Sequence, residues 1–513
     1  MAADPDFFPA KNFLNFHESY KVKTKGFWEL HPPALTGSAR VSVDGLRETT
    51  GQLQTLIAKA RAAAMPMRAV GSRWSLSEAP ASPGWAVETN RLVGWMKVAA
   101  DSVDPAYPGT ADEKAGLHLF QCGATVADVN RVLEAPANGR ALFTSGAANG
   151  QTIVGATSCG THGSALDHKA LHDHIVAIHL VPTADRHCWI ERKSRPVMKP
   201  EWVATLGAEL KRDDDELFNA AVVAFGSFGI IQAVVIETVP RYLLETNPQT
   251  VKLDEPLWKV IGELDFSAHP FFKDKGAPYF FQPVINPSSD EVLLSANYRK
   301  DCPADYVPKY GLTQKDHALG PGFDSLSLVG TILDRFKGLI PTFGKVAAAQ
   351  LFDTKAQTGT PGMIYGYKAP QLHVASGSIA VALPDIRRTL EALTALYKEI
   401  GPIPVVFGCR YVRKSPALLA FNKFDIGCMI SIDGVDSSLT RKFFDAAPAR
   451  LEAKGIAYTQ HWGKVNGYTR DRLKAAYGGN VDKWLAARRR VLPTVADRAV
   501  FDNAYIAERG LAG

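Results

Sequence analysis

Apolar runs and helical periodicities alternate in the first half of the chain. Residues 66–70, Pro-Met-Arg-Ala-Val, form a short run typical of a buried strand. Before them, Val41 and Val43 alternate as in a strand, and residues 48–50 resemble a helix N-cap. Apolar side chains then recur at helical spacing, at Leu53, Leu56, Ile57 and Ala60. This pattern predicts a β-α-β unit.

The same patterns predict elements farther along the chain. Strands are expected at residues 175–180, 230–236, 279–282 and 292–295. Helices are expected at residues 213–221 and 390–400. The later elements favour a second α/β lobe with an antiparallel sheet.

The stretch from Thr144 to Gly163 has little side-chain bulk. Its glycines are Gly146, Gly150, Gly155, Gly160 and Gly163. Glycine allows positive φ and close backbone approach, so N–H groups here can converge on an anion such as a pyrophosphate. The stretch therefore indicates a cradle for a phosphate-bearing cofactor, with a tight surface loop as the alternative.

Two further glycine-containing turns lie at the ends of predicted elements. Gly71 to Ser75 follows the strand at residues 66–70. Gly226 and Gly229 lie between the helix at 213–221 and the strand at 230–236. The first turn is a second place where backbone could meet phosphate, and the second turn places a glycine pair at a helix-to-strand junction.

Together the three segments resemble the flavoproteins of the vanillyl-alcohol oxidase (VAO) type, whose FAD domain is also called the PCMH domain. The segments are Val-Gly-Ser-Arg-Trp-Ser at 70–75, Ser-Cys-Gly-Thr-His-Gly at 158–163 and Phe-Gly-Ser-Phe-Gly-Ile at 225–230. The resemblance implies an α+β fold. It would comprise a PCMH-type FAD-binding domain of two α/β subdomains, and a substrate-binding cap domain with an antiparallel sheet flanked by helices.

The resemblance also implies which residues contact FAD and where the domains divide. The expected contacts are Gly71, Ser72, Arg73, Trp74, Ser75, Gly146, Thr152, Gly155, Ser158, Gly160, Thr161, His162, Gly163, Gly226, Gly229, Ile230 and Asn503. The expected divisions are an N-terminal extension at 1–35, the FAD domain at 36–240, the cap domain at 241–455 and a C-terminal segment at 456–513 that returns to the FAD site.

A fourth match lies near the C-terminus. His461-Trp462-Gly463-Lys464 resembles a motif of the aldonolactone and alditol oxidase branch, and residues 501–505, which include Asn503, resemble that branch's terminal motif. The implied activity is oxidation of a CH–OH group of a small alcohol, polyol or sugar lactone, with the flavin reoxidised by O2 or another acceptor. His461 would accept the substrate proton and Lys464 would stabilise negative charge. If the motif is only a polar turn, an FAD-binding electron-transfer or partner-docking protein is the alternative.

The sequence departs from the family at the frequent covalent attachment point. Trp74 stands where the family often has a histidine, and an indole cannot form the histidyl bond to the flavin. We therefore expect FAD to be held without a covalent bond here, with Trp74 stacking and Arg73 near the pyrophosphate.

A second departure concerns the substrate. The lactone and polyol branch has a glutamate two residues before an arginine on a strand facing the flavin; this chain keeps Arg410 but has Gly408 in place of the glutamate. Arg410 is then expected to bind a substrate oxygen or carboxylate, with Arg413 on the opposite face. Loss of the carboxylate makes a less polar alcohol, such as a sterol, an alternative substrate.

Composition is that of a soluble globular protein. Of 513 residues, 46% are hydrophobic and 21% charged, with a net charge of +6. We expect a cytoplasmic protein, because no signal peptide or membrane-spanning run is evident and the six cysteines are spaced as isolated thiols. The basic clusters at 488–490 and 192–195 are expected to be solvated, so no nucleic-acid partner is predicted.

One alternative uses a metal. A cysteine and four histidines lie within sixteen residues: Cys159, His162, His168, His172 and His174. They could be imagined as a zinc site, but no paired cysteine spacing accompanies them, and we expect no metal.

Overall fold

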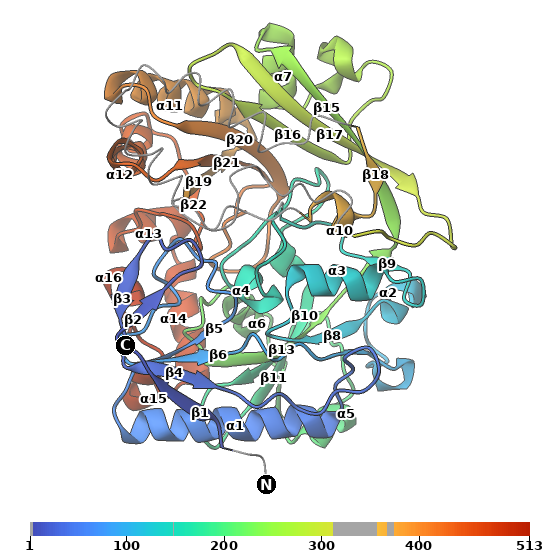
Figure 1. Ribbon diagram of the computed structural model, residues 1–513, viewed down its shortest axis with the longest axis vertical. Coiled ribbons are helices and arrows are strands. Elements are labelled where there is room, and N and C mark those ends of the chain that lie inside the picture. The colour runs from blue at the N-terminus through green and yellow to red at the C-terminus, as the bar shows by residue number, and fades with distance from the viewer. Residues whose placement is uncertain (1–3, 147, 311–355, 367–373) are drawn as a thin grey trace.

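The computed structural model describes residues 4–146, 148–310, 356–366 and 374–513. It stacks a lower part, with α1 along its base, beneath an upper part built on one large sheet (Figure 1). Residues 311–355 and 367–373 of the predicted cap domain lie outside the described residues.

The first sheet of the lower part has the strand order β1-β4-β6-β5. Its strands are β1 (Asp6–Pro9), β4 (Gly26–Glu29), β6 (Trp85–Glu88) and β5 (Met67–Val70). Because β6 runs parallel to both β4 and β5, the helix α1 (Val43–Ala62) connects two parallel strands. The first 35 residues therefore supply two strands of this sheet, and a short hairpin, β2 (Asn12–Leu14) and β3 (Lys21–Lys23), lies between them in sequence.

The second sheet has the order β12-β11-β10-β13-β8-β7. Its strands are β7 (Trp95–Lys97), β8 (His118–Gln121), β10 (Ile175–Val181), β11 (Cys188–Glu191), β12 (Glu209–Lys211) and β13 (Ile230–Ile236). The central β10 and β13 are buried at every residue. The helices of this region are α2 (Ala111–Ala115), α3 (Val126–Glu134), α4 (Ile153–Ser158), α5 (Pro200–Leu206) and α6 (Glu216–Ala221), and β9 (Arg140–Ala141) pairs with β14 (Val239–Pro240).

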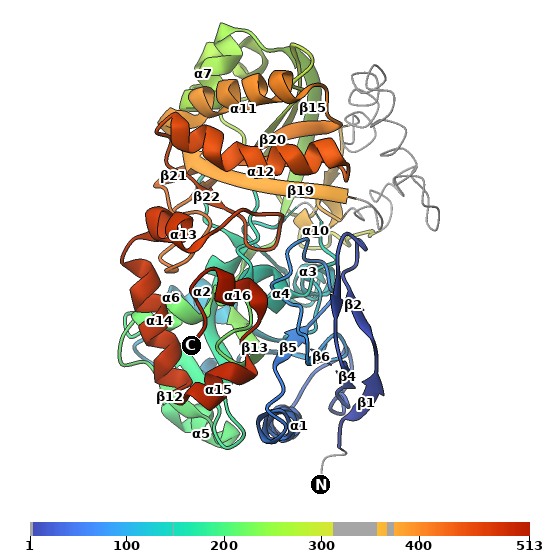
Figure 2. The ribbon, with the colours of Figure 1, turned by 90° about the vertical axis from the view of Figure 1, so that its left-hand side faces the viewer.

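The upper part is an antiparallel sheet with the order β18-β15-β17-β16-β20-β21-β19-β22. Its strands are β15 (Tyr242–Lys252), β16 (Phe280–Ile285), β17 (Glu291–Asp301), β18 (Thr358–Gly359), β19 (Val374–Ala382), β20 (Val405–Arg413), β21 (Ile426–Val435) and β22 (Thr459–Gln460). One face packs against α7 (Glu255–Glu263), α11 (Ile386–Ile400) and α12 (Ser438–Ala453) in a single apolar core. Figure 2 shows α11 and α12 side by side over that face.

The chain then returns to the lower part through four helices. They are α13 (Arg470–Tyr477), α14 (Asn480–Val491), α15 (Val495–Val500) and α16 (Ala504–Glu508). In Figure 2, α13, α14 and α15 descend along the lower part, and α16 lies above α15. Trp484 and Phe501 share a core cluster with Phe225 and Phe228, so the end of the chain is built into the lower core.

The strands predicted at 66–70, 175–180 and 230–236 are confirmed, as is the helix at 390–400 within α11. The predicted strand at Val41 and Val43, with its cap at 48–50, is wrong. The Ser42 hydroxyl accepts a hydrogen bond from the Gly45 amide and caps α1, so Val43 is already helical and β4 is the strand that precedes the helix.

One basic residue expected in solvent is buried. Arg488 is 0% exposed; its guanidinium binds Asp502 at 2.6 Å and the Ser227 carbonyl at 2.9 Å. The residue therefore ties α14 to the lower core. Within the described ranges, no helix is both long and apolar enough to cross a membrane.

Candidate functional site

The first glycine turn is bonded directly to the Gly-rich stretch. The Ser72 hydroxyl accepts a hydrogen bond from the Thr152 amide at 3.0 Å. A Cβ on Gly71 would lie 2.3 Å from Thr152 Oγ1, so only glycine fits there. Thr152 in turn caps α4, because its hydroxyl accepts from the Gly155 amide at 3.3 Å.

The third segment joins the same stretch from the other side. The Phe225 amide donates to the Ser158 carbonyl at 3.3 Å. Phe225 and Gly226 both have left-handed backbone, with φ of 50° and 76°. A Cβ on Gly229 would lie 2.7 Å from the Val181 carbonyl, which explains glycine where β13 begins at Ile230.

The C-terminal motif, His461 to Lys464, contacts the chain that follows the first turn and also the third segment. The Gly463 carbonyl accepts from the Leu76 amide at 2.9 Å, and the Ser77 hydroxyl donates to the Trp462 carbonyl at 2.6 Å. The Trp462 ring packs on Phe225 with centroids 4.2 Å apart. Four segments that are remote in sequence therefore meet, and Ser75 adds a contact at 3.3 Å to the Gly463 carbonyl.

Two buried histidines from different segments lie together here, with ring centroids 5.9 Å apart. His162 Nδ1 is 3.0 Å from the Gly163 carbonyl, which can only accept, so Nδ1 carries the hydrogen and Nε2 has a free lone pair. His461 Nδ1 accepts from the Gly463 amide at 3.0 Å, so in the neutral ring its hydrogen is on Nε2. The two rings are opposite tautomers.

Both histidines are neutral near physiological pH. Burial, followed by the charge of Arg410, holds the pKa of His162 well below its usual 6.5. Burial, followed by the charges of Lys464 and Arg410, does the same to the pKa of His461. The proton-accepting role predicted for His461 does not suit its tautomer, because Nε2–H is a donor and Nδ1 is already occupied.

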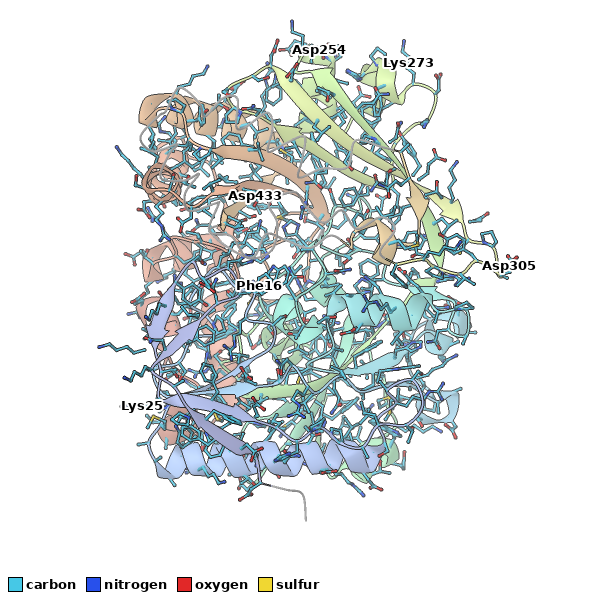
Figure 3. All side chains as sticks on the ribbon, viewed as in Figure 1. Phe16, Lys25, Asp254, Lys273, Asp305 and Asp433 are labelled. Carbon is cyan, nitrogen blue, oxygen red and sulfur yellow. The ribbon has the colours of Figure 1, made fainter. Side chains whose placement is uncertain are left out.

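One face of the upper sheet carries Ser376, Ser378, Ser431 and Asp433, and we call it the polar face. Lys464 is hydrogen-bonded on this face. Its ammonium donates to Ser431 Oγ at 3.1 Å and to Asp433 Oδ1 at 3.3 Å. Burial lowers the pKa of Lys464 from 10.5, while Asp433 opposes that shift. Figure 3 labels Asp433 in the upper part and Phe16 below it.

Arg410 projects from β20 onto the same face as Lys464 and its partners. Its strand register places Arg410 opposite Met429 and Gly408 opposite Ser431. Arg410 Nε is buried and has no hydrogen-bond acceptor among the described residues. Arg413, as expected, lies on the other face, where it pairs with Asp167 at 2.8 Å.

Sequence reasoning missed the polar partners on this face. Ser378 and Ser431 hydroxyls are 2.9 Å apart across β19 and β21, and Ser376 is hydrogen-bonded to Asp433. Alternate residues of these strands point to one face, so the alternation Ser431, Asp433 and Ser376, Ser378 was the available signal.

Trp74 and Arg73 are occupied by protein neighbours. Trp74 stacks on Phe16 with centroids 4.5 Å apart and planes 6° apart, and a Cβ on Gly150 would lie 2.4 Å from the indole. Arg73 forms an ion pair with Glu88 and lies over the Phe27 ring at 4.4 Å. Stacking is thus directed at the N-terminal segment, and the Arg73 charge expected near a pyrophosphate is compensated by Glu88.

Two further residues predicted to contact the cofactor, Asn503 and Gly163, are packed closely against other parts of the protein. Asn503 caps α16 and donates to the Ala81 carbonyl at 2.8 Å, so its amide is fully used by the protein. A Cβ on Gly163 would lie 2.0 Å from Thr144 Oγ1.

Four further residues predicted to contact the cofactor are Thr161, Gly160, Gly226 and Gly155. Thr161 donates its amide to the Ala156 carbonyl at 3.0 Å and has its side chain 3.1 Å from a Cβ on Gly146. Gly160 is left-handed, with φ of 78°. A Cβ on Gly226 would meet no atom within 4 Å, so this position leaves space beside the backbone, whereas a Cβ on Gly155 would lie 2.8 Å from Thr152 Oγ1.

The histidines of the imagined zinc site have protein partners. His172 Nε2 is 2.9 Å from Ser415 Oγ, and His174 lies 3.0 Å from the Glu237 carbonyl. In the part of the chain that the structure describes, no group of three His, Cys, Asp or Glu side chains is arranged to hold a metal. The geometry therefore gives the zinc alternative no support.

Sequence comparison finds lactone-oxidising proteins. Over 463 residues the chain is 24% identical to an L-gulono-1,4-lactone dehydrogenase of Mycobacterium tuberculosis, covering 88% of this chain and 92% of that protein. Over 207 residues it is 25% identical to a D-arabinono-1,4-lactone oxidase of Debaryomyces hansenii, covering 40% of this chain and 33% of that protein. The second match thus spans about a third of its relative. No protein-family model matches the sequence.

Solved structures share the whole fold. Cholesterol oxidase of Brevibacterium sterolicum superposes with a TM-score of 0.70 at 12% identity, covering 98% of this chain and 97% of that one. Xylooligosaccharide oxidase of Myceliophthora thermophila C1 gives a TM-score of 0.58 at 14% identity, covering 95% and 92%. A VAO-type flavoprotein of the same organism gives 0.56. The predicted α+β fold with an antiparallel-sheet domain is confirmed.

Proposed function

We propose that this chain, which has the fold of the VAO-type flavoproteins, is an FAD-dependent oxidoreductase that oxidises a CH–OH group of a small molecule. The substrate class is a polyol, sugar lactone or related alcohol, and O2 or another acceptor takes the electrons. One observation carries the proposal: three glycine-containing segments and the His461–Lys464 motif converge beneath the polar face that bears Arg410.

The residues present fit a flavin dinucleotide. The Gly-rich stretch is uncharged, and the turn at Gly226 has space beside its backbone, which suits backbone contact with phosphate. The buried Arg410 Nε finds no acceptor within the described part of the chain, as expected for a group that faces a ligand. FAD would be held by Ser72, the 152–163 stretch and the turn at 226–230.

FAD supplies a hydride acceptor for the substrate C–H. His162 Nε2, with its lone pair, takes the hydroxyl proton, while His461 Nε2–H donates a hydrogen bond to the substrate oxygen. Lys464 contributes positive charge at the reacting centre, and Ser431 and Asp433 hold its ammonium in place. The product is the corresponding carbonyl compound.

The electron-transfer or docking alternative lacks a reason for this constellation. A protein without alcohol chemistry has no need of two neutral histidines of opposite tautomer beside a buried lysine. A sterol substrate is equally disfavoured, because the face is lined by Arg410, Lys464 and Asp433.

The test is a spectrum followed by anaerobic reduction. The purified protein should show flavin absorbance, and acid precipitation should release FAD into the supernatant, because the Trp74 indole cannot form a histidyl-type bond. Alcohols should then bleach the flavin without air. A colourless protein that cannot be reconstituted with FAD would exclude the proposal, and flavin retained in the pellet would show a covalent bond elsewhere.

A further inference from the structure

The polar face of the upper sheet carries a cation, Arg410, for which the described residues provide no hydrogen-bonded anion. Arg410 Nε is buried and has no acceptor in the described residues. Arg410 as a residue is half-buried, and a buried N–H that lacks an acceptor costs free energy unless a bound group supplies one. The Arg410 environment is therefore incomplete without a ligand.

The neighbouring groups do not supply the missing charge. His162 and His461 are neutral, because burial lowers the pKa of each. Asp433 is already bonded to the Lys464 ammonium and to Ser376. Among the described groups around Arg410, the positive charges of Arg410 and Lys464 therefore exceed the negative charge of Asp433 by one.

The strand itself leaves space for an anion. Gly408, two residues before Arg410 on the same face, has no side chain. A Cβ there would lie 3.4 Å from Gln282 Nε2 and 3.9 Å from Ser431 Cβ, both ordinary contacts, so glycine is not required by packing. The absence of a side chain at 408 opens the face beside the guanidinium.

We propose that the substrate carries a carboxylate that binds Arg410, so that the enzyme oxidises a hydroxy acid of the aldonate type rather than a neutral polyol. This rests on the proposed function. The planar guanidinium donates two parallel hydrogen bonds to a carboxylate, which fixes the distance from the carboxylate to the oxidised carbon. The carboxylate would be unchanged by the reaction: FAD, when bound, would supply the acceptor for the C–H hydride, His162 would take the hydroxyl proton, and the product would be a keto acid.

The experiment compares molecules that differ only at one terminus. Gluconate is tested against sorbitol, and glycerate against glycerol, by anaerobic titration of the flavin absorbance of the holoprotein and by the shift of its melting temperature. We expect each carboxylate to bind about 10- to 100-fold more tightly than its neutral partner, as for a charge-assisted hydrogen-bond pair.

Four variants locate the effect. Arg410→Gln should abolish the preference for carboxylates. Arg413→Gln is the matched control, because Arg413 lies on the same strand but pairs with Asp167 on the opposite face, and the preference should persist. Gly408→Glu should also abolish the preference by neutralising Arg410, whereas Gly408→Gln, of equal size but uncharged, should retain most of it.

The outcomes separate this inference from the proposed reaction. Equal binding within each pair, no binding of either carboxylate, or a preference that survives in Arg410→Gln would overturn the inference. If sorbitol or glycerol then still bleaches the flavin, the proposed oxidation stands without it. An Arg410-dependent preference without any bleaching would keep the anion site and reject the alcohol chemistry.

Discussion

The Gly-rich stretch and the C-terminal motif each bring one histidine to the same place, yet the two rings are prepared for opposite tasks. His162 donates to a carbonyl and leaves a lone pair, while His461 accepts from an amide and leaves an N–H. Burial and nearby cations keep both neutral. A single backbone partner therefore decides whether the free nitrogen of a buried, neutral histidine accepts or donates a hydrogen bond.

The largest expected effect is at the acceptor. His162→Gln should slow flavin reduction by about 10²–10⁴-fold, because an amide cannot take a proton in place of the imidazole. The measurement is stopped-flow reduction of holoprotein by the best substrate found. Flavin content serves as the control, since His162 also lies in the Gly-rich stretch. Wild-type reduction in a variant that retains FAD would remove His162 from the proton path.

The donor should respond differently to the same substitution. His461→Ala should slow reduction by about 10²–10³-fold, as when a preorganised hydrogen-bond donor is lost. His461→Gln should recover much of that loss, because the amide N–H can replace Nε2–H. Equal damage from alanine and glutamine at His461 would show that the ring acts as a base after all, and the assigned tautomers would be wrong.

The sequence alone predicts the framework of the site better than it predicts the chemistry of its side chains. The glycine-containing turns and the strands at 66–70 and 230–236 could be predicted because local residues determine them. The partners of Lys464 could not, because Ser431 and Asp433 lie on β21 and reach it only through the register of the folded sheet. The histidine tautomers depend on backbone groups whose orientation exists only in the fold.

The position of Trp74 shows the same limit. The sequence indicates that the usual attachment histidine is missing, and this follows from residue type alone. That the indole stacks on Phe16, with centroids 4.5 Å apart, depends on an N-terminal segment placed by β1 and β4. Contacts between segments remote in sequence carry no local signal, so they were not foreseen.

A smaller effect is expected from the support of Lys464. Burial lowers the pKa of the lysine and Asp433 raises it, so Asp433→Asn should lower it further. The rate depends on the ammonium form and falls as the pH rises through this pKa. The alkaline limb of the reduction rate should therefore move to lower pH in the variant, with a modest loss at neutral pH. An unchanged limb would show that Lys464 charge does not control the rate.

The smallest expected effect concerns the acid side of the pH profile, where we expect no change in the rate of flavin reduction. A base is active when deprotonated, and the rate is lost only as the pH falls through its pKa. Because burial and Arg410 hold the pKa of His162 well below 6.5, the reduction rate should stay constant from about pH 8 to about pH 6. Arg410→Gln removes one of the cations that lower this pKa, so an acid limb should move toward higher pH in that variant, measured at saturating substrate. A wild-type acid limb centred near 6.5 would mean that the proton acceptor is a solvated histidine, and the contrast between His162 and His461 would lose its physical basis.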